Sequence, residues 1–413
     1  MNPSDKLWQV DLISLVYGGD AMGRLEDGRA VFVPYALPGE KVMVRLIEEK
    51  KGHARARLVD VLLPSPERIT PRCRHFSDCG GCHYQHLPYE RQLEVKRFVL
   101  KEQLQRIANL HDAPVDLVVP SPAPWNYRNT LQFHLAADGK IGFLGVDSHR
   151  VVAISECHLP EEALNDTWPQ LEFETGSGLD RVELRQGAGE ELLLILEGDL
   201  DKGPQFQTEL RLSAVYASDG QLKLLAGDEF IWMDVLNRPF KVSAGSFFQV
   251  NSLQAEAMIE HILSILPLTS QSTVLDLYCG VGLFSAFIAP RVKRCVGIEV
   301  SPSACEDFAI NLDEFDNVEL YVGTVENVVP GLDFKADMVV MDPPRSGVDK
   351  FALDEIVKMQ PELIAYVSCD PATLARDTRR LLSGGYRLER VTPFDMFPQT
   401  YIIESISLFR FSA

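Results

Sequence analysis

The sequence predicts three parts: a small β-barrel, a mostly-β middle region and an α/β domain at the carboxyl end. Three observations support this division. Short apolar runs separated by turn residues fill the first 64 residues, a proline-rich stretch follows, and apolar runs alternate with helical patterns after residue 246. A chain of 413 residues also normally divides into more than one compact domain. We therefore expect domains over residues 1–64, 65–245 and 246–413.

The first 64 residues have the pattern of a small barrel. Turn residues separate runs in which apolar and polar side chains partly alternate, and several short strands in so few residues favour a closed sheet. Pro64, Pro66 and Pro71 then mark a linker. The expected strands cover residues 8–16, 30–33, 41–46 and 54–63.

Helical and strand patterns then follow each other along the chain. One long helix is predicted over residues 90–110, and we expect it to pack on the carboxyl-terminal domain. Strand patterns fill residues 125–245. In the last domain, apolar runs alternate with helical stretches, which is typical of a parallel α/β sheet. The helix has apolar residues at Leu93, Phe98, Leu100, Leu104, Ile107 and Leu110, and the last domain has apolar runs at 273–278, 294–300, 337–342 and 363–369.

The net charge of the chain is −19, with 40 Lys and Arg against 59 Asp and Glu. Such acidity argues against a polyanionic partner, because phosphates bind where Lys and Arg neutralise them. The first 112 residues, however, hold 17 basic and 15 acidic residues, so the acidity lies in the later two thirds. Basic clusters at 50–57 and 68–74 are either solvated faces or a surface for a polyanion.

The sequence also bears on location and redox state. It contains no run of about 18 apolar residues and begins without a basic segment followed by an apolar one, so we expect a cytoplasmic protein without a membrane span. We further expect a monomer. Without a secretory signal, the eight cysteines favour metal binding or catalysis over disulfides.

A ligand-binding turn is predicted at residues 276–282, where an apolar strand leads into a helical pattern. Gly280 and Gly282 permit a tight turn and close approach of a ligand to the backbone. A dinucleotide fingerprint would require a third glycine where Ser285 stands. The next strand ends at Glu299, whose carboxylate suits both hydroxyls of a ribose. The alternative is a plain glycine turn beside an acidic surface residue.

Three chemically active side chains are predicted near the same sheet edge. Asp342 ends an apolar strand and is followed by two prolines and Arg345, where amine-directed methyltransferases have an aromatic residue. Cys369 ends the next strand, where a thiolate nucleophile or a packed cysteine would both fit. Glu404 lies among isoleucines, so burial would raise its pKa and suit a general base, whereas an exposed edge position is the alternative.

These motifs together resemble the RNA uracil-C5 methyltransferase family, which forms 5-methyluridine with S-adenosylmethionine. The resemblance implies that Cys369 attacks C6 of uracil and that Glu404 removes the C5 proton. It also implies that Gln249, Tyr278, Glu299 and Asp342 contact the methyl donor. The fold it implies is a Rossmann-like class I domain after a TRAM barrel similar to OB folds. The matching stretches are 247–251, 276–282, 342–347, 368–377 and 395–398.

The resemblance implies an RNA partner, and 23S ribosomal RNA is the predicted substrate. Transfer RNA is the alternative substrate, and a non-catalytic RNA-binding assembly factor is the alternative class. Methylation of cytosine C5 is disfavoured because such RNA enzymes usually place a second cysteine where Asp342 stands. Gln399 and Ile402 stand where the family usually has histidines, and Leu283 replaces a frequent asparagine, so the surroundings of Glu404 are expected to differ.

Four cysteines have spacing typical of metal ligands: Cys73, Cys79 and Cys82, with Cys157 far along the chain. Spacing alone leaves zinc, an iron–sulfur cluster and unligated buried thiols open. The resemblance implies a [4Fe–4S] cluster, for which we expect a structural or RNA-positioning role. Separately, residues 125–129 offer aromatic and guanidinium surfaces for stacking a base, or simply strand core.

Overall fold

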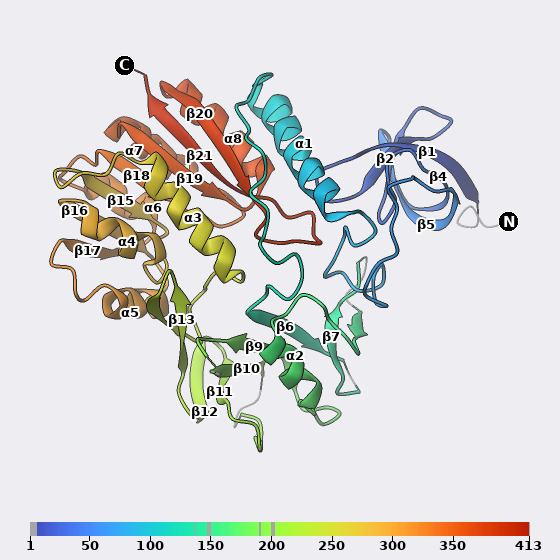
Figure 1. The fold of residues 1–413 in the computed structure, drawn as a ribbon, viewed down its shortest axis with the longest axis horizontal. Coiled ribbons are helices and arrows are strands. Elements are labelled where there is room, and N and C mark those ends of the chain that lie inside the picture. Colours follow the sequence, from blue (N-terminus) through green and yellow to red (C-terminus); the bar gives the residue numbers. More distant parts are fainter. Residues whose placement is uncertain (1–5, 137, 147–149, 190, 200–202, 413) are drawn as a thin grey trace.

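The chain folds into a barrel, a central sheet and a larger α/β domain, as Figure 1 shows. The computed structural model describes residues 6–136, 138–146, 150–189, 191–199 and 203–412. The blue barrel lies on one side of the molecule and the yellow-to-red α/β domain on the other, with helix α1 between them (Figure 1). Among the described residues, no helix combines the length and apolar character that a membrane span requires.

The amino-terminal strands form the predicted barrel, closed in the order β1-β2-β3-β5-β4. Its inward side chains, such as Val10, Val31 and Val42, are buried in alternation with exposed ones. Strand β2 was not among the expected strands, and it passes so close to β1 that a Cβ on Gly23 would lie 2.5 Å from a Val10 methyl. The strands are β1 (Leu7–Leu15), β2 (Ala21–Arg24), β3 (Ala30–Val33), β4 (Lys41–Glu49) and β5 (His53–Leu63).

The central region is built on a seven-stranded sheet in the order β12-β11-β10-β9-β6-β7-β8. A short helix, α2 (Glu162–Thr167), packs its Leu164 into the core of this sheet with Phe133 and Val182. The strands are β6 (Thr130–Leu135), β7 (Ile141–Leu144), β8 (Val151–Ala153), β9 (Leu179–Gln186), β10 (Leu192–Gly198), β11 (Ser213–Ser218) and β12 (Gln221–Ala226).

The carboxyl-terminal sheet has the order β17-β16-β15-β18-β19-β21-β20. Its first five strands are parallel, as the four apolar runs predicted, whereas β21, for which no direction was predicted, pairs antiparallel with β19 and with β20. The loop 395–403 joins β20 to β21, where parallel strands would need a helical crossover. The strands are β15 (Thr273–Leu277), β16 (Arg294–Glu299), β17 (Val318–Val322), β18 (Met338–Met341), β19 (Leu363–Ser368), β20 (Tyr386–Phe394) and β21 (Glu404–Phe411).

Helices cover this sheet, and a hairpin joins its core. The hairpin, which precedes the expected domain start at residue 246, buries Ile231 and Phe240 with residues of α3 and α4. The hairpin strands are β13 (Phe230–Val235) and β14 (Arg238–Ser243). The helices are α3 (Ser252–Ile265), α4 (Leu283–Ile288), α5 (Pro302–Asn311), α6 (Val325–Val328), α7 (Lys350–Met359) and α8 (Pro371–Ser383).

Helix α1 (Tyr89–Ala108) packs against α8, and Leu100 and Leu104 share one core with Leu374 and Leu381. Its buried face differs from the expected apolar face. Phe98 is 54% exposed, whereas the polar residues Gln92, Lys96 and Gln103 are buried.

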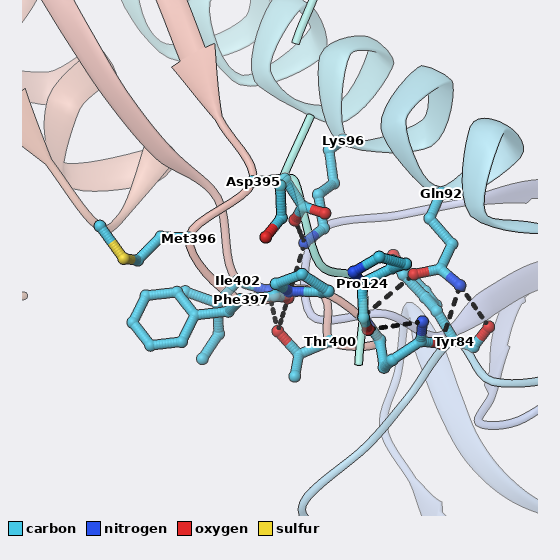
Figure 2. Close-up of polar contacts among 12 residues, drawn as sticks. Tyr84, Gln92, Lys96, Pro124, Asp395, Met396, Phe397, Thr400 and Ile402 are labelled. Atoms are coloured by element: carbon cyan, nitrogen blue, oxygen red, sulfur yellow. Dashed lines mark hydrogen bonds and ion pairs between the residues drawn. The ribbon is translucent and has the colours of Figure 1, made fainter. Parts of the chain in front are cut away.

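The buried polar residues of α1 hold the segment between β20 and β21. The Lys96 ammonium, 1% exposed, lies 2.5 Å from Asp395 Oδ1 and donates to the Phe397 carbonyl at 2.9 Å (Figure 2). Burial lowers the pKa of Lys96, and the Asp395 charge opposes that shift. A buried pair of this kind requires both partners, because either charge alone would remain desolvated.

Removing Lys96 alone should therefore destabilise the protein. We expect Lys96→Met to lower the free energy of unfolding by about 3–5 kcal/mol, and the double variant Lys96→Met/Asp395→Leu to recover much of that loss. Urea unfolding of the three proteins measures both changes. Lys101→Met, on the same helix, is the control and should change stability by only about 0.5 kcal/mol. A single variant as stable as the wild type would contradict the interpretation.

Candidate active site at the carboxyl edge of the sheet

The predicted site residues gather where parallel strands end. Tyr278, Glu299, Asp342 and Cys369 follow or end strands β15, β16, β18 and β19, whose carboxyl ends share one edge of the sheet. Ligands of doubly wound sheets bind outside this edge. The structure thus collects four residues that span more than 90 positions of sequence.

The glycine turn has the geometry that its sequence predicts. Gly280 and Gly282 have φ values of 55° and 91°, and a Cβ on Gly282 would lie 2.2 Å from Leu312. Ser285, at the missing third glycine, donates its hydroxyl to the buried Asp276 carboxylate at 2.6 Å. Burial raises the pKa of Asp276 to about 7. Ser285 therefore stabilises the strand before the turn.

Glu299 is held beside the glycine turn by backbone groups. Its Oε2 accepts from the Gly280 N–H at 2.9 Å, and its Oε1 accepts from Val300 and Ser301 at 2.7 and 2.8 Å. A carboxylate has about four lone-pair sites, so about one remains for a ligand. We expected Glu299 to accept hydrogen bonds from two ribose hydroxyls, but it has only about one acceptor site free.

The segment with Gln249 connects strand β14 to helix α3. Asn129 donates its side-chain amide to the Gln249 carbonyl at 2.9 Å and to the Ser252 hydroxyl at 3.1 Å. Asn251 caps helix α3 and donates to the Met396 carbonyl at 3.3 Å. These contacts fix the backbone around Gln249 between the central sheet and the segment before Glu404.

The antiparallel pairing of β19 and β21 brings Cys369 and Glu404 together. Ser368 lies opposite Ser405, so the next pair in this register is Cys369 and Glu404. Glu404 is 5% exposed, as its isoleucine neighbours predicted, whereas Cys369 is partly accessible.

The charges around this pair favour its protonated forms. Burial raises the pKa of Cys369 to about 12, with the carboxylates of Glu404, Asp342 and Asp370 acting in the same direction and Arg345 against it. Burial also raises the pKa of Glu404, aided by Asp342 and opposed again by Arg345. Arg345 is thus a site residue whose role sequence reasoning missed, although it follows Asp342 and two prolines.

The segment between β20 and β21 is fixed by buried amides. Gln399, where a family histidine was expected, exchanges hydrogen bonds with Gln92 at 3.0 and 3.1 Å and donates to the Pro124 carbonyl at 3.3 Å (Figure 2). Its own carbonyl accepts from His83 and Tyr84. Helix α1, the chain at Pro124 and the cysteine-containing segment therefore meet at one residue, which lies five positions before Glu404.

Comparisons with known proteins agree with this geometry. A family model described as tRNA (Uracil-5-)-methyltransferase matches residues 228–331 and 329–410, and a TRAM domain model matches residues 10–59. An RNA methyltransferase of Halalkalibacterium halodurans is 33% identical over 97% of this chain and 96% of its own. The chain belongs to the RNA (uracil-5-)-methyltransferase family. A relative from Listeria monocytogenes, also named an RNA methyltransferase, is 33% identical over 97% of this chain and 96% of its own.

A solved structure supports the same assignment over the whole chain. The tRNA (uracil-54, C5)-methyltransferase of Pyrococcus abyssi, in complex with S-adenosyl-L-homocysteine, is 26% identical with a TM-score of 0.74. The match covers 97% of this chain and 100% of that chain. The predictions of the family, an RNA substrate, a TRAM domain and S-adenosylmethionine as methyl donor are therefore confirmed.

The four cysteines of this methyltransferase lie within electrostatic reach of one another. Burial raises the pKa of Cys82, and the neighbouring thiols Cys157, Cys79 and Cys73 act in the same direction. Backbone N–H groups lie 3.4 Å from the sulfur atoms of Cys73 and Cys79. As placed, however, no group of three or more His, Cys, Asp or Glu side chains in the described part of the chain could hold a metal ion.

Residues 125–129 were expected either to stack on a base or to form strand core, and the two aromatic residues differ in this respect. Tyr127 is buried and donates its hydroxyl to the Pro398 carbonyl at 3.1 Å, so its ring is packed and unavailable for a base. Trp125 remains partly accessible, with the Arg72 guanidinium 5.3 Å from its ring.

Proposed function

We propose that this methyltransferase modifies C5 of a uridine in structured RNA through a covalent bond between Cys369 and C6. The observation that carries the proposal is the register of β19 and β21, which pairs Ser368 with Ser405 and, extended by one residue, places Cys369 opposite Glu404. C5 of uracil is a weak nucleophile until a thiolate adds to C6, which makes C5 an enolate-like carbon. S-adenosylmethionine supplies the methyl group that this carbon takes.

The second half of the proposed reaction needs a base. The Glu404 carboxylate takes the remaining C5 proton, the C5–H electrons restore the C5–C6 double bond, and the Cys369 thiolate leaves. A target base must leave its stack to reach a thiol at the sheet edge. The buried position of Glu404 keeps water from competing for this proton.

For the methyl donor we propose contacts with Gln249, Tyr278, Glu299 and Asp342. The position of the last three beyond β15, β16 and β18, around the glycine turn, supports this assignment. Because Glu299 has about one free acceptor site, we propose that it receives one ribose hydroxyl.

For the substrate we propose 23S ribosomal RNA, on the resemblance of the TRAM barrel and the four-cysteine pattern to enzymes of that type. Transfer RNA is the second candidate, favoured by the printed activity of the Pyrococcus abyssi structure. The two candidates differ in which RNA gains 5-methyluridine. Total RNA that contains both kinds of substrate can therefore distinguish them.

Variants at Cys369 and Glu404 test the mechanism on RNA from cells that lack the protein. Wild type should add 5-methyluridine at a defined nucleotide, and Cys369→Ala should neither do so nor be trapped by 5-fluorouridine RNA. Glu404→Gln should accumulate the protein–RNA adduct, because the C5 proton then stays in place. Mass-spectrometric mapping identifies the RNA. Turnover by Cys369→Ala would refute the nucleophile, and a Glu404→Gln variant as fast as wild type would refute the base.

The protonation of the site predicts a pH dependence. Since burial raises the pKa of Cys369 to about 12 and also raises that of Glu404, both active forms are lost as the pH falls. We expect the single-turnover methylation rate to rise at least tenfold per pH unit between pH 6 and 8, because the thiolate fraction rises tenfold per unit and loss of the Glu404 proton can only steepen the rise. Rapid-quench assays at saturating RNA measure this, and a flat profile would contradict it.

We further propose that Cys73, Cys79, Cys82 and Cys157 bind a [4Fe–4S] cluster with a structural role. Four sheltered thiols with N–H groups directed at sulfur suit such a cluster, although the side chains must turn toward a shared centre. The His83 and Tyr84 N–H groups, next to Cys82, donate to the Gln399 carbonyl at 2.8 and 3.0 Å. A cluster that fixes the cysteine segment would therefore also fix the segment before Glu404, through these two hydrogen bonds.

Iron analysis tests the cluster. Protein purified without oxygen should contain about four iron atoms per chain and absorb broadly in the visible range. Cys82→Ser should lose the iron, whereas the control Cys305→Ser, in the methyltransferase core, should keep it. One equivalent of zinc with no iron would contradict the proposal.

A further inference from the structure

The turn between β1 and β2 of the TRAM barrel reaches the methyltransferase site. Residues 17–20 form this turn, which the Val16 and Gly19 N–H groups close with hydrogen bonds at 3.0 Å. Arg55 of β5 lies 3.2 Å from the Asp20 carboxylate and ties the turn to the barrel. The turn is thus a short, fixed projection from the barrel.

One contact of the turn is made with the residue that follows the proposed nucleophile. The Tyr17 hydroxyl donates to Oδ2 of Asp370. The other oxygen of Asp370 caps helix α8 and accepts from the Ala372 and Thr373 N–H groups, both at 2.9 Å. Both oxygens of this carboxylate are therefore engaged, and its backbone is fixed directly beside Cys369.

A second contact is made with the segment before the proposed base. Gly19 has a φ of 89°, and a Cβ built there would lie 3.1 Å from Tyr401 Cβ and Cδ1. Tyr401 lies three positions before Glu404, and its ring meets the His83 ring edge-on at 4.5 Å between centroids. The turn therefore contacts the chain on both sides of the Cys369–Glu404 pair.

We propose that residues 17–20 are a positioning element of the methyl-transfer site. By bonding Asp370 and packing on Tyr401, the turn fixes the two chain segments that present Cys369 and Glu404. The TRAM barrel then contributes to the rate of the chemical step, in addition to any contribution to RNA affinity. This inference rests on the proposed roles of Cys369 and Glu404.

Tyr17→Phe tests the hydrogen bond while keeping the ring. Tyr17 is 38% exposed, so the change leaves the barrel core intact. We expect the single-turnover rate at saturating RNA and S-adenosylmethionine to fall about tenfold, with the RNA dissociation constant within about twofold of wild type. The control Tyr216→Phe loses a hydroxyl bond to the Gly198 carbonyl in the central sheet and should retain the wild-type rate.

A glycine pair tests the packing contact. Gly19 and Gly28 both lie in barrel turns with φ near 90° (89° and 87°), but a Cβ on Gly28 meets nothing within 4 Å. Both alanine variants carry the same backbone strain, so only Gly19→Ala should slow the saturated rate and the trapping of 5-fluorouridine RNA. Thermal unfolding should show a loss of stability in both variants from the shared backbone strain, and a larger loss in Gly19→Ala because its Cβ also crowds Tyr401.

The outcomes separate this inference from the mechanism on which it rests. A wild-type rate in Tyr17→Phe, or weaker RNA binding with an unchanged saturated rate, would overturn the positioning role while Cys369→Ala stays inactive. Equal slowing by Gly19→Ala and Gly28→Ala would also overturn it. Turnover by Cys369→Ala would instead refute the nucleophile itself.

Discussion

The antiparallel pairing of β19 with β21 is the constraint on which the site depends. In a purely parallel sheet, one edge receives only the carboxyl ends of strands. An antiparallel strand brings its amino end to that edge, and Glu404 is the first residue of β21. Side chains alternate between the faces of a strand, so a slip of one residue would move Glu404 away from Cys369. The buried pairing of the two strands specifies this register, and contacts of the segment that leads into β21 add to it.

The segment between β20 and β21 forms no helix or strand. Its conformation therefore depends on contacts with other parts of the chain. Distant parts of the chain bond to its buried polar groups: Lys96 pairs with Oδ1 of Asp395, and Gln92 and the backbone at 83–84 bond to Gln399. Buried groups of this kind are costly unless paired, so they define one arrangement sharply. Gly19 of the barrel also contacts this segment, at Tyr401. Three parts of the chain thus fix one loop.

Sequence patterns predicted the strand-end residues well, because each depends on local order. An apolar run followed by Glu299, Asp342 or Cys369 places that residue at the sheet edge without knowledge of its neighbours. Long-range pairing was beyond such reasoning. Phe98 was expected on the buried face of its helix but is exposed, and Lys96 is buried beside Asp395, a partner almost 300 positions later that local patterns do not reveal. The hydrogen bonds of Ser285 and Tyr17 likewise required three-dimensional contacts that residue types do not reveal.

The acidity of the carboxyl-terminal domain, which first argued against an RNA partner, includes three carboxylates next to Cys369. Asp342, Asp370 and Glu404 surround Cys369, and their charges together with burial keep its thiol protonated. Such a thiol is protected from oxidation and from stray electrophiles, since only the thiolate reacts readily. The exposed Arg345 opposes these charges and lowers the pKa of both Cys369 and Glu404. The low reactivity of such a thiol suits a partly accessible cysteine that should not react before its substrate is bound.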